Sequence, residues 1–527
     1  MSNHAYESAA ALRPQRCAPT ALNDLAECFA LDASRIDPSR LPEILVTGVS
    51  VDSGDVAAGE LFTALPGFKR HGALFAAEAA GSGALAVLTD DAGAEIVRRE
   101  APDLPVLTHP DPRAVVGPLA ARIYHHPARR LTTAAVTGTN GKTTTSYFLD
   151  AILAAHLGGC MVAGTVELRV GGLSVESPRT TVEAPVLQRM MALAVEDRVG
   201  AASLEASSHA IVLHRLDGLV VDVAGFTNLQ RDHLDFHKTM EGYLKAKAQL
   251  FTPEHARRGV VCVDDRWGAA LADEAPIEID RVRAYPGDTP ADWWVSDATV
   301  SLTDSATTFT LHGPDGEQIE ASCPLPGLVN IQNAALALVM AIRAGVPAAT
   351  ATAALAGAHN IPGRMQRISQ RDGQRGLCIV DFAHTPDAME LALKAVRPIT
   401  PGRLIVVFGS DGDRDQGKRP MLGEVCARLA DVLVVTDENP RSEDPQLIRN
   451  AILEGVRSVR PDLEDVEEVT TWRGDAVRRG VELCGPQDTV IVTGKGHEPF
   501  LEAAGEFIRY NDAPVMAEAV EQKWGRG

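Results

Sequence analysis

The feature that most constrains this chain is a glycine-containing turn placed between a predicted strand and a predicted helix. Residues 131–136 form an apolar, β-branched run, residues 137–145 read TGTNGKTTT, and residues 146–153 have the apolar spacing of a helix. A phosphate-binding loop requires this order, because the backbone N–H groups of the turn and the N-terminus of the helix face the phosphates. The stretch therefore predicts an ATP site in an α/β domain.

Two side chains of this loop have expected roles. Lys142 is expected to meet the outer phosphates of ATP, and Thr143 offers its hydroxyl to Mg²⁺. Val136 stands where the full Walker pattern has glycine, so the loop is a shortened variant of the P-loop. The alternative is a plain strand-to-helix turn with a surface lysine. The loop residues expected to bind ATP are Gly138, Thr139, Asn140, Gly141, Lys142, Thr143 and Thr144.

Length and charge limit the remaining possibilities. A chain of 527 residues is too long for one core and fits about three domains of ~100–200 residues each. Its 50 basic and 70 acidic side chains give a formal net charge of −20, which would repel a nucleic acid, so no nucleic-acid partner is expected. The eight cysteines include no C-x-x-C pair, which argues against a zinc module and a disulfide scaffold.

No targeting or membrane segment is expected either. The N-terminal residues lack the apolar stretch of a signal peptide, and no window reaches the uncharged length of a membrane helix. The most apolar window, residues 334–358, is interrupted by Arg343 and Pro347 and predicts a buried pair of helices. We therefore expect a soluble, cytoplasmic protein, and a monomer.

The pattern of elements predicts an α/β protein of three domains, at residues 1–125, 126–360 and 361–527. The first domain has strand candidates at residues 45–51, 60–65 and 84–88 and carries no catalytic signature by itself. The second contains the predicted P-loop and a central parallel sheet.

Polar clusters follow several apolar runs of the second domain. They stand at residues 180–181, 203–209 and 227–235, which is typical of the carboxyl ends of parallel strands, where ligands bind in open α/β sheets. Glu205 and His233 in these clusters are candidate metal ligands. The helical period of residues 243–251 by itself predicts a solvated basic face, and Asn330 and Asn333 are expected to cap a helix.

The third domain repeats a rhythm of strand, polar turn and helix. Strand candidates at residues 377–380, 404–408, 432–435 and 490–493 each end in a polar turn, so the four turns are expected to form one rim. Arg414 and Arg441 on this rim could bind a carboxylate, and Glu438 and Glu498 an ammonium group. This combination favours an amino acid as ligand; the alternative is a solvated rim.

Collinear segments along the chain resemble the Mur ligases of peptidoglycan synthesis, and within them the MurE type, the UDP-N-acetylmuramoyl-tripeptide synthetases. The matching segments are residues 51–53, 60–67, 137–145, 180–181, 205–209, 214–215, 228–235, 243–251, 363–365, 381–387, 412–420, 439–441 and 494–498. The resemblance implies an N-terminal domain that binds the UDP part of the substrate, a central P-loop ATPase domain and a C-terminal Rossmann-like domain that binds the incoming amino acid.

The resemblance also implies roles for individual residues. Glu205, His233 and Lys247, the last as a carbamate, would join Thr143 as ligands of Mg²⁺, with Lys142, Glu205, His233 and Lys247 catalytic. Asn333, Arg364 and Asp381 would complete the ATP site, with Arg364 and Asp381 arriving from the third domain. The expected contacts of the UDP-muramoyl dipeptide are Ser53, Asn140, Thr180, Thr181, Ser207 and Arg215. Those of the amino acid are Arg414, Glu438, Asn439, Pro440, Arg441, Gly494 and Glu498.

The activity that the resemblance implies is ATP-dependent addition of meso-diaminopimelate to UDP-N-acetylmuramoyl-L-alanyl-D-glutamate through an acyl phosphate. Arg441 favours meso-diaminopimelate, whose distal carboxylate needs a guanidinium, although Glu438 stands where the family usually has aspartate. The alternatives are the L-lysine-adding version of the same ligase, another amide ligase of the superfamily, and a P-loop ATPase without ligase activity.

Overall fold

A computed structural model describes residues 10–67, 69–300, 306–358 and 361–525. The chain divides into two compact units, which are described separately. The first comprises Met1–Trp294, Gly313–Glu317 and Gln332–Ala354, and the second Val295–His312, Gln318–Ile331 and Leu355–Gly527. In the described part of the chain, no helix combines the length and the apolar character needed to cross a membrane.

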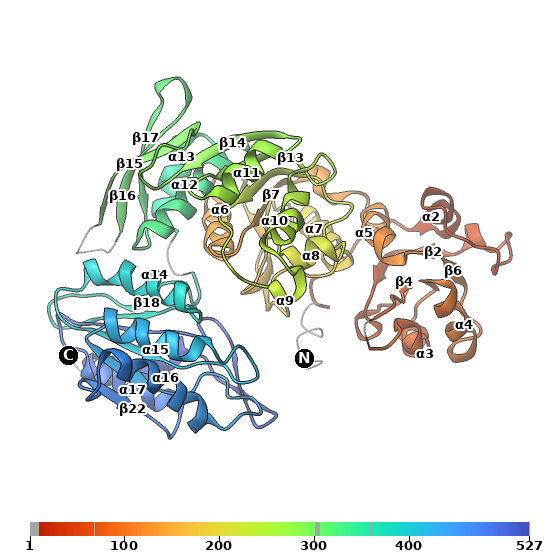
Figure 1. Ribbon diagram of the computed structural model, residues 1–527. Helices are drawn as coiled ribbons and strands as arrows, with labels where there is room; N and C mark the ends of the chain where they lie inside the picture. Colours follow the sequence, from red (N-terminus) through yellow and green to blue (C-terminus); the bar gives the residue numbers. More distant parts are fainter. Residues whose placement is uncertain (1–9, 68, 301–305, 359–360, 526–527) are drawn as a thin grey trace. The chain divides into compact units, whose positions relative to one another are not determined.

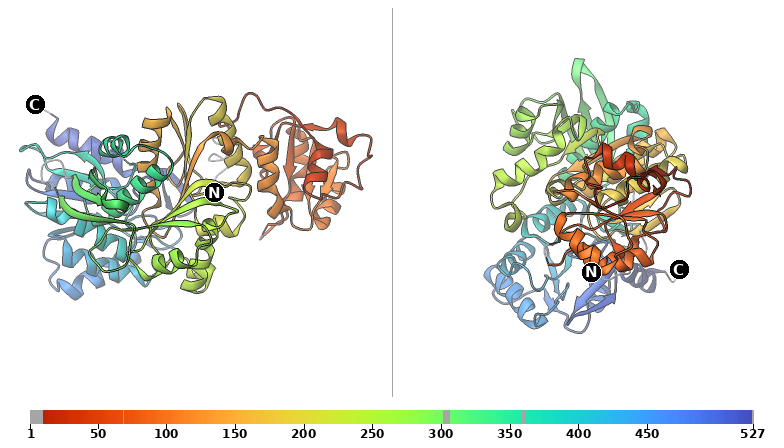
Figure 2. Two further views of the ribbon diagram at one scale, coloured as in Figure 1. Left: turned by 90° about the horizontal axis from the view of Figure 1, so that it is seen from above. Right: turned by 90° about the vertical axis from the view of Figure 1, so that its right-hand side faces the viewer.

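The N-terminal part of the first unit is a four-stranded parallel sheet between two layers of helices (Figures 1 and 2). Its strands, in spatial order, are β3 (Gly48–Ser50), β4 (Glu60–Thr63), β5 (Ala86–Thr89) and β6 (Val106–Thr108). Its main helices are α2 (Leu22–Cys28), α3 (Ala76–Gly81), α4 (Asp91–Glu100) and α5 (Pro112–Ile123). Neighbouring side chains such as Leu61 and Phe62 enter opposite cores, because successive residues of a strand point to opposite faces.

The central part of the first unit is a larger sheet with the predicted P-loop strand in its middle. Its parallel strands, in spatial order, are β8 (Cys160–Ala163), β11 (Ala201–Glu205), β7 (Thr132–Thr137), β12 (Val221–Phe226), β13 (Ala256–Cys262) and β14 (Glu278–Arg283). Two antiparallel strands, β9 (Glu167–Val170) and β10 (Leu173–Glu176), extend the β8 edge. Glu205 pairs with Val136 and Phe226 with Thr137, so the ends of β11 and β12 flank the start of the loop.

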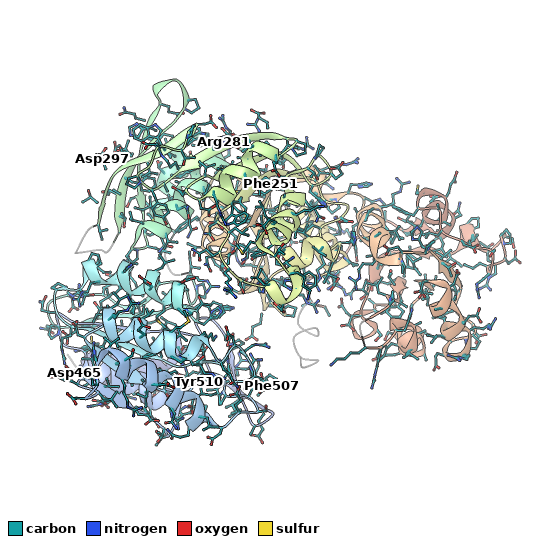
Figure 3. The ribbon with its side chains drawn as sticks, in the orientation of Figure 1. Phe251, Arg281, Asp297, Asp465, Phe507 and Tyr510 are labelled. Atoms are coloured by element: carbon teal, nitrogen blue, oxygen red, sulfur yellow. The ribbon has the colours of Figure 1, made fainter. Side chains whose placement is uncertain are left out.

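The direction of the strand connections puts this loop at a switch point. The chain passes from β7 outward to β8 and then returns through β11 and β12 to the opposite side, so right-handed connections place helices on both faces. These helices are α6 (Lys142–Leu157), α7 (Ala184–Glu196), α8 (Ser208–Val212), α9 (Leu234–His237), α10 (Met240–Ala248) and α11 (Arg266–Glu274). Phe251, labelled in Figure 3, follows α10 and is fully buried in the core that covers one face.

The apolar window near residue 340 forms the predicted pair of helices, α12 (Leu328–Arg343) and α13 (Ala348–Ala356). One of the points at which the chain passes from one unit to the other falls within α12. Three further strands precede this pair: β15 (Trp293–Val300), β16 (Thr307–His312) and β17 (Gln318–Cys323).

The second unit contains a six-stranded sheet that is parallel except at one edge. In spatial order its strands are β18 (Gln366–Ser369), β19 (Leu377–Val380), β23 (Thr489–Val492), β20 (Leu404–Phe408), β21 (Val432–Val435) and β22 (Val466–Glu468). Its helices are α14 (Pro386–Val396), α15 (Lys418–Leu429), α16 (Pro445–Val459), α17 (Arg473–Leu483) and α18 (Asp512–Trp524). The four predicted strands are neighbours, so their polar turns lie at one edge, as the sequence predicts.

The predicted fold class is confirmed, because both units are built on parallel sheets covered by helices. The division into three domains at residues 125 and 360 remains a prediction. The residues on both sides of position 125 belong to one compact unit, although each side has its own sheet.

Candidate active site

The predicted phosphate-binding loop connects β7 to α6 and depends on two glycines. Gly138 has φ +145° and Gly141 has φ +89°, values that favour glycine. A Cβ on Gly138 would lie 1.8 Å from Thr227 Oγ1, and one on Gly141 would lie 2.3 Å from Asn333 Oδ1. The loop is therefore closely packed, and Asn333 of α12, predicted to bind the nucleotide, lies against it.

The turn after β12 holds the loop in place. Asn140 N–H donates to Asn228 Oδ1 at 3.1 Å, its side-chain amide donates to Gln230 Oε1 at 2.7 Å, and Thr227 Oγ1 donates to the carbonyl of Asn140 at 2.6 Å. The sequence pattern placed residues 227–235 near the site but assigned none of these three a role. Their position immediately after an apolar strand is the signal that could have identified them.

Lys142 begins α6 and folds back over the loop. Its Nζ donates to the carbonyls of Gly138 and Thr139 at 3.1 and 2.9 Å. The ammonium group thus lies on the side of the turn where the outer phosphates of a nucleotide would bind.

A buried carboxylate faces the next residue of the helix. Thr143 Oγ1 donates to Glu205 Oε2 at 3.0 Å, and Thr165 donates to the same carboxylate through both its N–H, at 2.8 Å, and its hydroxyl, at 2.9 Å. A hydroxyl and a carboxylate are the oxygen donors that Mg²⁺ prefers, so Thr143 and Glu205 fit such an ion. The described residues contain no group of three or more His, Cys, Asp or Glu side chains arranged to hold a metal.

Four of the six residues predicted to contact the UDP-muramoyl dipeptide lie together near Glu205. Thr181 Oγ1 donates to the carbonyl of Glu205 at 2.7 Å and to Ser207 Oγ at 3.3 Å. Arg215 Nη1 donates to the carbonyl of Thr181 at 3.2 Å, and the Thr180 and Thr165 hydroxyl oxygens lie 3.2 Å apart. Thr180, Thr181, Ser207 and Arg215 are thus brought together at the ends of neighbouring strands.

Ser53 is not part of this cluster. It lies after β3 in the N-terminal part of the unit, where its hydroxyl donates to Glu78 Oε2 at 2.7 Å. That part is joined to α7 by a buried ion pair, in which Arg189 Nη1 lies 2.8 Å from Asp55 Oδ2.

The position of Lys247 contradicts the prediction from helical period, which put it on a solvated face. Only 1% of the residue is exposed, so it does not belong to a solvated face. Its Nζ donates to the carbonyl of Gly138 at 2.7 Å and lies 4.5 Å from the centre of the Tyr243 ring. Burial, together with the nearby ammonium of Lys142, lowers the pKa of the Lys247 amine well below its usual range.

His233 lies near the loop but is more exposed than the other candidates. Its side chain is 47% exposed, with Nε2 3.4 Å from Asp232 Oδ2. Burial, with Lys142 and Lys247 opposing the attraction of Asp232, lowers its pKa. The structure does not bring His233 into contact with Glu205. His233 instead lies against His209, with 4.9 Å between the two ring centres.

The predicted amino-acid residues lie at the rim of the second unit. Asn439 Nδ2 donates to Glu498 Oε2 at 3.1 Å, and the fully buried Lys495 donates to Asn439 Oδ1 and Glu498 Oε2 at 2.8 and 2.9 Å. Gly494 has φ +107°, and a Cβ there would lie 2.5 Å from Glu438 Oε2. Glu438, Asn439, Gly494 and Glu498 therefore form one cluster. Lys495, which the sequence pattern did not single out, holds Asn439 and Glu498 together.

Glu438 is the strongly perturbed acid of this cluster. It is 3% exposed, and burial, reinforced by Asp411, raises its pKa to about 8. The turn that follows it continues through Pro440, whose carbonyl packs against Gly412, to Arg441 at φ +55°. Arg414 is exposed in the preceding turn. In the described part of the chain it makes no hydrogen bond or ion pair, so the structure does not bring it to Glu438.

Two predicted nucleotide residues also lie in the second unit. Arg364 lies over the Phe382 ring, with 4.4 Å from its guanidinium carbon to the ring centre. Asp381 follows β19 and accepts the N–H groups of Met365 and Ala383 at 2.8 and 2.9 Å.

Comparison with family models covers most of the chain. Residues 45–124 match the model described as "Mur ligase family, catalytic domain", residues 136–341 match "Mur ligase middle domain", and residues 363–496 match "Mur ligase, glutamate ligase domain".

Individual proteins are similar over nearly their whole lengths. A Streptomyces coelicolor protein named UDP-N-acetylmuramoyl-L-alanyl-D-glutamate–2,6-diaminopimelate ligase is 44% identical, over 97% of this chain and 99% of that protein. A Leifsonia xyli protein named UDP-N-acetylmuramyl-tripeptide synthetase is 43% identical, over 95% and 96%. A solved structure titled as a ligase of the first kind has a TM-score of 0.67 at 30% identity, over 96% and 99%. On this evidence the chain belongs to the Mur ligase family.

Proposed function

We propose that this chain is the ATP-dependent ligase that adds meso-diaminopimelate to UDP-N-acetylmuramoyl-L-alanyl-D-glutamate, in the cytoplasm, in the synthesis of peptidoglycan precursors. The names of its relatives support the substrates. The observation that carries the proposal is the continuous set of contacts from Thr143 of the P-loop through Glu205 to Thr181 and Arg215. These contacts support a role for Arg215, which also pairs with Glu183 at 3.0 Å, as the cationic group that meets the anionic acceptor.

Activation of the carboxylate is the first step. A carboxylate does not react with an amine at neutral pH, so the side-chain carboxylate of D-glutamate attacks the γ-phosphorus of ATP, ADP leaves, and an acyl phosphate forms. Two negatively charged groups must meet in this step, so catalysis depends on positioning and on cationic side chains. Lys142 donates to the transferring phosphoryl group, and Arg215 orients the substrate. Thr143 and Glu205 would hold Mg²⁺, which would offset the charge of the phosphates; only the family resemblance adds His233 and carbamylated Lys247 to its ligands.

Amide formation is the second step. The free amino group of diaminopimelate attacks the acyl carbon, the new C–N bond replaces the C–O bond to phosphate, and inorganic phosphate leaves while the amine loses a proton. Asn439, Arg441, Gly494 and Glu498 hold the amino acid, with Pro440 shaping the turn. Arg364, Asp381 and Asn333 contact the nucleotide.

The test is release of phosphate from ATP in the presence of Mg²⁺ and UDP-N-acetylmuramoyl-L-alanyl-D-glutamate. Separate reactions receive meso-diaminopimelate, L-lysine or no amine. We expect release with meso-diaminopimelate alone. Release with L-lysine at an equal rate would contradict the role of Arg441, and release without any amine would favour an ATPase that is not a ligase.

A further inference from the structure

Two turns at the rim of the second unit place a carboxylate next to the predicted carboxylate-binding arginine. Asp411 follows β20 and Arg441 follows the neighbouring strand β21. Arg441 Nη2 lies 3.8 Å from Asp411 Oδ2, too far for a hydrogen bond. The N–H of Gly412 donates to the carbonyl of Asn439 at 2.8 Å and fastens the two turns together.

Several buried polar atoms around this pair have no hydrogen-bond partner within the described residues. They are Asp411 Oδ1, Glu438 Oε2, Arg441 Nε and the hydroxyls of Ser410 and Thr436. An unsatisfied buried polar group costs about 1–3 kcal/mol, and more when it is charged. Grouped in two neighbouring turns, these atoms offer a bound ligand both donors and acceptors.

The chemistry of these atoms defines what the ligand must carry. The Asp411 Oδ1 atom calls for a hydrogen-bond donor or a cation, while the Arg441 guanidinium calls for an acceptor or an anion. The Arg441 Nη2 to Asp411 Oδ2 spacing of 3.8 Å suits two opposite charges held on one carbon atom. An ammonium and a carboxylate on the same carbon are the distal end of diaminopimelate, whereas L-lysine has the ammonium alone.

The electrostatics around Glu438 point the same way. Asp411 and Glu498 add to burial in raising the pKa of Glu438, while Arg473 and Lys418 oppose it. After burial, repulsion from Asp411 is thus the largest cause of the raised pKa of Glu438. A ligand ammonium placed among these carboxylates would relieve this repulsion.

We propose that Asp411 is a specificity-determining residue that binds the distal ammonium of meso-diaminopimelate while Arg441 binds the carboxylate on the same carbon. The proposal rests on the proposed function and adds to it a residue for which neither the motifs nor the family resemblance gave a role. Asp411 acts on the substrate directly, not through Arg441.

The test compares three amines with wild type and Asp411→Asn. meso-Diaminopimelate carries both distal charges, L-2-aminopimelate lacks the distal ammonium, and L-lysine lacks the distal carboxylate. We expect Asp411→Asn to raise the KM for meso-diaminopimelate by about 10- to 100-fold, the range for a hydrogen bond to a charged group, with the KM for ATP unchanged. We expect the same substitution to leave the KM for L-2-aminopimelate unchanged.

Two matched variants separate binding from positioning. Glu502→Gln removes the other carboxylate near Arg441, 3.7 Å from its Nε, and should affect meso-diaminopimelate and L-2-aminopimelate equally if it steadies the guanidinium. Asp415→Asn removes an exposed carboxylate of the same loop, which accepts the Gly417 N–H, and should change no KM. Asp411→Ala is a second substitution at the same position. Circular dichroism of every variant checks that it is folded.

The possible results have distinct meanings. If Asp411→Asn raised the KM for meso-diaminopimelate and for L-2-aminopimelate equally, Asp411 would only position Arg441. If it left the KM for meso-diaminopimelate unchanged, Asp411 would have no role. Either result overturns the proposal. Wild-type protein that releases no phosphate with any amine would contradict the proposed function itself, a failure distinct from both.

Discussion

At the scale of single residues, Lys247 has the most unusual environment. Burial beside Lys142 disfavours the ammonium form and so favours the neutral amine, which is the form that reacts with carbon dioxide to give the carbamate implied by the family resemblance. We expect Lys247→Ala to reduce phosphate release by about 10²-fold or more, a loss comparable to that of one preorganised transition-state contact. Bicarbonate or a short-chain carboxylic acid should restore part of the activity by entering the space.

The control for this variant lies on the same helix. Lys245 is exposed, so Lys245→Ala should retain wild-type turnover and show no response to added acids. Normal turnover of Lys247→Ala would exclude a catalytic carbamate.

Glu438 makes the free energy of unfolding depend on pH in a predictable direction. Its pKa is about 8 in the folded protein against 4.5 ordinarily, so the folded state holds a proton that the unfolded state releases. The contribution of this carboxyl group to the free energy of unfolding therefore falls as pH rises from about 4.5 to about 8, and it is lowest above about pH 8. Glu438→Gln lacks this titration.

Thermal denaturation without substrates measures the effect. As pH rises from about 5 to about 9, the Tm of Glu438→Gln should increase relative to that of wild type. The corresponding change in the relative free energy of unfolding is on the order of a few kcal/mol. A difference that does not vary with pH would mean that the carboxyl titrates normally.

At the scale of secondary-structure elements, one buried ion pair joins α17 to α18. Arg473 and Asp512 are both fully buried, with 2.8 Å between Nη2 and Oδ2, and Tyr510, labelled in Figure 3, donates to the same carboxylate at 2.9 Å. Arg473 also donates to the carbonyls of Asp437 and Thr493, which precede Glu438 and Gly494. The pair thus supports the turns of the predicted amino-acid pocket.

We expect Arg473→Met to lower the free energy of unfolding by about 3–5 kcal/mol, because it leaves Asp512 buried without a counter-charge. Adding Asp512→Asn should recover part of the loss. Urea denaturation followed by circular dichroism measures both. A loss below about 1 kcal/mol for the single variant would show that water or another group compensates Asp512.

At the scale of the whole molecule, the two compact units have separate cores. We expect scanning calorimetry to resolve more than one transition, since separate units need not unfold together. meso-Diaminopimelate should raise the temperature of the transition that Arg473→Met lowers, and ATP with Mg²⁺ should raise the temperature of the other. At 100 times its dissociation constant, each ligand should add about 2.7 kcal/mol to the free energy of unfolding of the unit that binds it.

Glycine, which lacks the distal charges of diaminopimelate, is the control ligand and should shift neither transition. If meso-diaminopimelate raised the same transition as ATP, the amino-acid pocket would have been assigned to the wrong unit.

Local sequence patterns were sufficient to predict the parts of the fold that depend on neighbouring residues. Alternation of apolar runs with polar turns predicted the parallel sheets, and the P-loop pattern predicted the turn that joins β7 to α6 at Lys142. The four strands of the second unit were predicted within one residue of their observed ends. Such patterns are readable because strand, turn and helix each impose a short-range period.

Tertiary structure alone decided which side chains meet. Helical period made Lys247 a surface residue, but α10 carries it to the carbonyl of Gly138, 109 residues earlier. Nothing near Asp411 in the sequence indicates that β20 and β21 are neighbours and that Arg441 will face it. The order of strands in a sheet and the burial of a charged group depend on contacts between distant segments, and local periodicity carries no information about them.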